Sequence, residues 1–283
     1  MTGRLRVVTT LALELVARGV DGTTAEYVEA RPLVEWACQK YRAVAPTESE
    51  RLFHFAAVAL QQGARDDQFG PAHRDGTRAN HLLHALERFP QDSRLRLAYV
   101  TLGRPAHLLS GWPVSPGFLV SAGAIDPEPP EAAKSLQAAD DMLSVLVDDP
   151  QVGDEATLRR GALRYMRGQF ETARPDLEVA AKSREDFVRY LGSLMLGLTL
   201  ERTGREAEAV PYYAAAFRVL PATAAAVALS AALARQGRSA EAAPVIEEWS
   251  GADRADDPWR LYSFRDYRLF PSYLSRLRAM VRQ

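Results

Sequence analysis

The feature that most constrains the fold is a glycine that recurs along the second half of the chain. Gly168, Gly204 and Gly237 are 36 and then 33 residues apart. A stretch of helix-forming residues precedes each glycine, and "QFETA", "REAEA" or "SAEAA" follows it closely. Glycine often ends a helix because it adopts the left-handed conformation without steric cost. The pattern therefore predicts consecutive helix–turn–helix units of one kind.

Positions beyond the glycine also match in residue size between the units. Each unit has an alanine five residues after its glycine and a larger residue four further on: Ala173 and Leu177, Ala209 and Tyr213, Ala242 and Ile246. Small residues such as Gly197 allow two helices to approach closely, and a large residue such as Tyr213 fills the space beside them. The spacing predicts Tyr213 as a packing residue rather than a catalytic one.

With this spacing the units resemble tetratricopeptide repeats, which are helix–turn–helix units of about 34 residues. The middle unit fits best, since it carries the family's small, aromatic and closing positions as Gly197, Ala209, Tyr213, Ala216 and Pro221. The first unit lacks the closing proline, and the last has Ser230 in place of the small glycine. The resemblance implies three repeats within residues 154–254. It also implies a right-handed solenoid of antiparallel helix hairpins, in which stacking buries the apolar faces.

The rest of the chain is also expected to be helical, so the predicted fold is all-α and a single helical-repeat domain, 1–283. Residues 1–150 read as divergent helical hairpins with insertions at about 64–76 and 103–130. Residues 257–283 are rich in aromatic side chains and end in a helical pattern. A solenoid needs a terminal cap for its last apolar face, which predicts a C-terminal capping helix there.

Charge and cysteine content exclude some classes of protein. Lys and Arg number 35 against 36 Asp and Glu, which argues against a nucleic-acid-binding protein. The one cysteine excludes an intramolecular disulfide.

Only three basic residues are lysine, a bias typical of a GC-rich, bacterial genome. The N-terminus is expected to be an amphipathic helix, so the cytoplasm is the expected location. A periplasmic or secreted location would need a signal peptide outside this sequence.

The sequence contains no motif that predicts chemistry. Glycine-rich phosphate loops, His-Glu-x-x-His, paired cysteines and Gly-x-Ser-x-Gly are all missing from it. His81 and His84 are spaced to share one helix face, but the leucines between them fit a core-facing helix better than a metal site. No catalytic residue, metal or cofactor is therefore expected. An enzyme would have to place its site in the insertion at 103–130.

In the family that the units resemble, the first helices line a concave groove that holds an extended or helical peptide. The resemblance then implies a partner-binding stripe at Leu158, Ala162, Tyr165, Leu191, Leu194, Leu198, Glu201, Val227 and Ala231. Neighbouring helices or the insertion could equally bury this stripe. The predicted function is a non-catalytic scaffold or adaptor for protein–protein interaction, with an enzyme or a self-assembling structural solenoid as alternatives.

Overall fold

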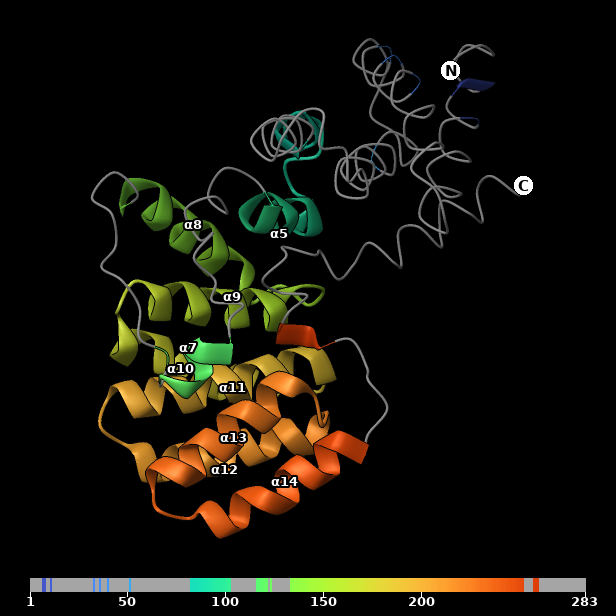
Figure 1. Ribbon diagram of the computed structural model, residues 1–283. Coiled ribbons are helices and arrows are strands. Elements are labelled where there is room, and N and C mark those ends of the chain that lie inside the picture. Colours follow the sequence, from blue (N-terminus) through green and yellow to red (C-terminus); the bar gives the residue numbers. More distant parts are fainter. Residues whose placement is uncertain are drawn as a thin grey trace. The chain divides into compact units, whose positions relative to one another are not determined.

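The structure is a computed structural model of the 283-residue chain. It describes residues 82–102, 116–121, 123, 133–251 and 257–259, with residues 7, 8, 11, 33, 36, 40 and 51 singly or in a pair. Every regular element in these residues is an α-helix (Figure 1), which confirms the all-α prediction for this part of the chain. None of these helices is both long and apolar enough to cross a membrane.

The chain divides into two compact units. One contains Met1–Arg104 together with Tyr267–Gln283, and the other contains Pro105–Asp266. Both ends of the chain therefore belong to the same unit, a grouping that the repeat pattern does not indicate. The predicted insertion at 64–76 and most of the predicted cap lie outside the described residues.

The longest described stretch of the first unit is a pair of helical segments joined at Pro90. Residues 82–88 are helical, and α5 (Ser93–Leu102) follows. Asp92 caps α5, since its carboxylate accepts hydrogen bonds from the Leu95 N–H at 3.1 Å and from Arg51 at 2.6 Å. Burial raises the pKa of Asp92, but these hydrogen bonds and the nearby arginine charge outweigh burial and hold it below its ordinary value.

The second unit is a series of helices in which neighbours along the chain pack together. From α8 to α14 each helix contacts the next, α9 also contacts α11, and the short α7 contacts α13. The helices are α7 (Pro116–Val120), α8 (Ala133–Leu146), α9 (Gly153–Met166), α10 (Phe170–Ala180), α11 (Asp186–Arg202), α12 (Glu206–Val219), α13 (Thr223–Arg235) and α14 (Ser239–Gly251).

The three recurring glycines form the same turn. Gly168, Gly204 and Gly237 have φ of 72°, 74° and 73°, in the left-handed region that favours glycine. In each turn the residue after the glycine donates its N–H to the carbonyl five residues earlier. These bonds join Gln169 to Arg164, Arg205 to Leu200 and Arg238 to Leu233, at 2.9, 2.8 and 2.8 Å. This is the Schellman geometry, and it confirms the predicted helix ends.

Packing within the hairpins also repeats. A Cβ on Gly161 would lie 2.8 Å from Leu177, and a Cβ on Gly197 would lie 2.4 Å from Tyr213. Leu177 and Tyr213 are both fully buried. The small residue of one helix therefore receives the large residue of the next, as the spacing predicts. A proline also recurs at the sixth residue of each second helix, as Pro175, Pro211 and Pro244.

The last helix differs from its counterparts in burial. No residue of α14 is buried, and Ile246 is 44% exposed. Leu177 and Tyr213, which occupy the same position in the earlier units, have no exposed surface. Each of these two is covered by a following hairpin, whereas the described residues beyond α14 include only a short helical segment at 258–259.

Candidate functional site

The predicted groove residues lie on α9, α11 and α13, the first helices of the three hairpins. Val227 and Ala231 on α13 are half-buried. The others are buried, each at most 7% exposed: Leu158, Ala162, Tyr165, Leu191, Leu194, Leu198 and Glu201. The structure thus brings these residues into one core, and segments of the same chain cover part of it.

The first covering segment is α7, which comes from the predicted insertion at 103–130. Figure 1 shows this short green helix among the yellow and orange helices of the second unit. It packs against α13, and its Phe118 and Leu119 belong to the same buried cluster as Tyr165 and Leu198. The Phe118 ring lies edge-on to Tyr165, with 6.4 Å between ring centroids. Phe118 is therefore buried against Tyr165, one of the predicted groove residues.

Gly123 lies directly against two of the predicted groove residues. The Tyr165 hydroxyl donates to the Gly123 carbonyl at 2.6 Å. A Cβ at Gly123 would lie 2.0 Å from the Tyr165 hydroxyl oxygen and 3.1 Å from Leu198. Its φ of 70° is in the left-handed region. Only glycine fits this position. Any side chain would clash with Tyr165, and a positive φ would strain the backbone of any other residue.

A charge pair with one buried member contacts the last residue of α7. Arg235 donates to the Val120 carbonyl at 2.7 Å and also pairs with Glu201. The Glu201 side chain is 1% exposed, and its second oxygen accepts a hydrogen bond from the Tyr213 hydroxyl at 3.0 Å. Both carboxylate oxygens are therefore satisfied inside the protein. Glu201, predicted as a groove residue, positions the guanidinium that binds α7.

The second covering segment is Asp257–Trp259, at the start of the predicted C-terminal cap. Trp259 is 2% exposed, and its ring lies 6.2 Å from that of Phe118. We call residues 116–121, 123 and 257–259 the cover segments. Of the predicted stripe, Tyr165 and Leu198 lie against Gly123, and Tyr165 also lies against Phe118.

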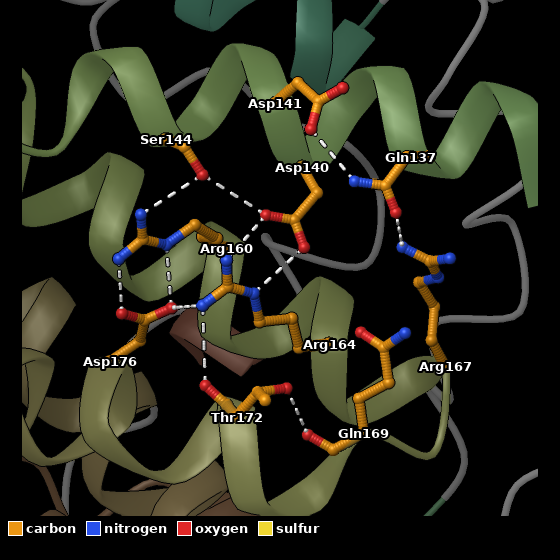
Figure 2. A network of polar contacts seen from close by, with 10 residues as sticks. All are labelled: Gln137, Asp140, Asp141, Ser144, Arg160, Arg164, Arg167, Gln169, Thr172 and Asp176. Carbon is orange, nitrogen blue, oxygen red and sulfur yellow. Dashed lines mark hydrogen bonds and ion pairs between the residues drawn. The ribbon is translucent and has the colours of Figure 1, made fainter.

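A second polar region, which sequence reasoning missed, joins α8, α9 and α10 (Figure 2). Arg164 donates to Asp140 at 2.8 and 2.9 Å and to Asp176 at 3.0 Å. Arg160 makes two more bonds to Asp176, at 2.8 and 2.6 Å. Both carboxylates are buried, at 6% exposed. The hydrogen bond to Asp140 is the main cause that raises the pKa of Arg164, so its charge is permanent.

An open depression of about 710 Å³ lies beside this network. It is lined by Asp140, Arg164, Gly168, Gln169, Phe170, Glu171, Thr172 and Thr203. The two charged groups of the network that line it already bind each other, so the network fixes α8 onto the first hairpin rather than presenting a charge to a ligand. Arginines at i and i+4 on a helix that is otherwise buried are the signal that could have indicated it.

The neighbouring Asp140 and Asp141 point in different directions. Asp140 faces inward to Arg164, while the exposed Asp141 accepts a hydrogen bond from Gln137 at 2.9 Å. In the ranges that the structure describes, no group of three His, Cys, Asp or Glu side chains is placed to hold a metal ion. His84 is described, whereas its candidate partner His81 is not.

No model of a known protein family matches the chain, and a search among curated proteins finds no match.

Proposed function

We propose that this chain is a non-catalytic scaffold or adaptor, a cytoplasmic solenoid of tetratricopeptide-like repeats that binds a partner peptide in the groove formed by α9, α11 and α13. Two features support the repeat architecture. The turns at Gly168, Gly204 and Gly237 share one hydrogen-bond pattern. The contacts of Gly161 and Gly197 with the following helix are equivalent.

The observation that carries the proposal is the way the groove holds α7. A five-residue helix is too short to be stable alone, so its position depends on the groove. The groove supplies an apolar seat for Phe118 and two side-chain donors for main-chain carbonyls, Tyr165 and Arg235. A buried aromatic anchor with polar groups at its edge is the arrangement by which protein surfaces bind peptides.

The enzyme alternative has less support from the same residues. Of the insertion at 103–130, the structure describes 116–121 and 123. There Phe118 and Leu119 are buried in the core, and Gly123 packs on Tyr165. These residues contribute packing and backbone carbonyls, not a set of converging titratable groups.

Site-specific photo-crosslinking tests the proposal. A photoreactive amino acid replaces Val227, which is half-buried on the predicted stripe, and the full chain is exposed to light in a lysate of its native organism. Val179 on α10 provides the matched control, since it is a valine on the outer surface at 58% exposed. We expect a specific protein to crosslink at Val227 but not at Val179, and to bind the purified chain in calorimetry.

Two outcomes would contradict the groove as the binding site. One is a crosslinking pattern that is the same at Val227 and Val179. The other is a captured protein whose affinity for the purified chain is unchanged when Val227 is replaced by arginine, with the helical circular dichroism retained.

A further inference from the structure

On the basis of the proposed function, we infer that the partner is a peptide with an aromatic residue followed five positions later by a glycine, and that it replaces this chain's own residues around α7. The pattern is read from Phe118 and Gly123, which the groove holds in the same chain. The segment therefore acts as an intramolecular ligand, and its contacts define the chemistry of the external one.

The aromatic requirement comes from the seat of Phe118. Its side chain is 8% exposed and lies between the rings of Tyr165 and Trp259, at centroid distances of 6.4 and 6.2 Å. An aromatic pair contributes to binding beyond the burial of its area. An aliphatic side chain at this position would lose both ring contacts. The site therefore favours a partner residue with a phenyl-sized ring.

The backbone of the peptide is held at two carbonyls three residues apart. Arg235 on α13 donates to the carbonyl of Val120, and Tyr165 on α9 donates to that of Gly123. Every peptide has carbonyls at these positions, so the two donors fix the register of the bound peptide and not its sequence. The Val120 side chain itself is 54% exposed and places no demand on the partner.

The glycine requirement is steric. The Gly123 N–H donates to the Phe118 carbonyl at 2.8 Å, so the backbone turns back on itself with φ of 70° at this point. A side chain there would lie 2.0 Å from the Tyr165 hydroxyl oxygen. Alanine or any larger residue would therefore lose the Tyr165 hydrogen bond or move the peptide out of the groove.

Peptide binding to the full chain tests the inference, with a labelled peptide of sequence PGFLVSAG and fluorescence anisotropy as the readout. In the wild-type chain the internal segment competes at an effective concentration in the millimolar range, so binding is expected to be weak. Gly123→Ala expels the internal segment but leaves every groove side chain intact. We expect it to bind the peptide about 10-fold more tightly than the wild type.

Gly168→Ala is the matched control. Its φ of 72° imposes the same backbone penalty, but a Cβ there meets nothing within 4 Å. It should bind the peptide as weakly as the wild type does. A peptide with alanine in place of phenylalanine, or alanine in place of the final glycine, should show no binding to Gly123→Ala.

Equal affinity of PGFLVSAG for Gly123→Ala and for the wild type would overturn the inference. It would also be overturned if either altered peptide bound Gly123→Ala as tightly as PGFLVSAG does. If Gly123→Ala loses its helical circular dichroism, Phe118→Ala is used in its place, because it removes the internal aromatic side chain. The affinity of PGFLVSAG for Phe118→Ala is then compared with its affinity for the wild type. A failed peptide test with successful crosslinking at Val227 would mean a partner of other chemistry, whereas failed crosslinking would count against the proposed function.

Discussion

The Asp257 carboxylate accepts a hydrogen bond from the Tyr190 hydroxyl at 3.0 Å, although 67 residues separate the two in sequence. Its other oxygen accepts the Ala224 N–H at 2.7 Å. Ala224 lies in the first turn of α13, whose own N-cap residue, Ala222, has no side-chain oxygen. A residue from the C-terminal part of the chain therefore supplies the cap that α13 lacks and ties it to α11.

Asp257→Ala is expected to lower the free energy of unfolding by about 1–3 kcal/mol, because it removes the cap of α13 and leaves the buried Tyr190 hydroxyl without its acceptor. Asp257→Asn keeps an acceptor oxygen, so its free energy of unfolding should fall clearly less. Urea denaturation followed by circular dichroism measures both. Equal stability of Asp257→Ala and the wild type would show that the cap does not contribute.

Alkaline pH is expected to destabilise the protein through its core tyrosines. Burial raises the pKa of Tyr165, Tyr190 and Tyr213 above the ordinary value. Above about pH 10 an unfolded chain has lost these phenolic protons while the folded chain retains them. The folded state then binds more protons, so its stability is full below about pH 10 and falls as the pH rises further.

A titration that records phenolate absorbance and circular dichroism together checks this pH dependence. The last tyrosines to ionise should do so as the helical signal is lost. Complete ionisation of all 10 tyrosines with an unchanged helical signal would contradict it.

The pair of Arg164 and Asp140 is expected to be strongly coupled. Arg164→Met leaves the buried Asp140 without its charged partner, and should cost about 2–4 kcal/mol once the partial exposure of the arginine is considered. In a double-mutant cycle with Asp140→Asn, the second substitution should recover part of this loss, with a coupling above about 1 kcal/mol. Urea denaturation of the four proteins measures it.

The exposed pair of Arg205 and Glu208 is the control for this cycle. Its side chains are 40% and 56% exposed. Solvent screens such a pair, so the corresponding cycle should give no measurable coupling. Similar couplings for the two pairs would mean that burial does not strengthen the Arg164 network.

Gly197→Ala is expected to destabilise the protein even though alanine is the better helix former. The new methyl group would lie 2.4 Å from the Tyr213 ring, and overpacking of this kind costs about 1–3 kcal/mol. Gly251→Ala is the control, since its Cβ meets nothing within 4 Å and the glycine ends α14. Thermal unfolding should show a lower midpoint for Gly197→Ala and an equal or slightly higher one for Gly251→Ala.

The sequence predicted the local features of the second unit well. Gly168 and its two counterparts end helices as expected, and Tyr213 packs on Gly197. These features depend on spacings of a few residues within one hairpin. Residues that share a helix face or a turn are fixed relative to one another by backbone geometry, so their positions can be read from a single sequence.

The candidate site was predicted only in part. The spacing identified the stripe with Leu194 and Leu198, but it left open what lies over it. Phe118 comes from an insertion without any repeat pattern, and Trp259 comes from beyond the last repeat. The Arg164 network was missed because Asp140 is 24 residues away on another helix.

The sequence by itself determined where helices end and which residues pack within a hairpin, because these depend on local backbone geometry. Only the tertiary structure decided that the stripe on α11 is buried, that Gly123 lies on Tyr165 and that Asp257 caps α13. The contact of Tyr165 with Gly123 joins residues 42 positions apart, and that of Asp257 with Ala224 joins residues 33 positions apart. Their free energy comes from groups that meet only when the whole unit has folded, so no spacing along the chain specifies them.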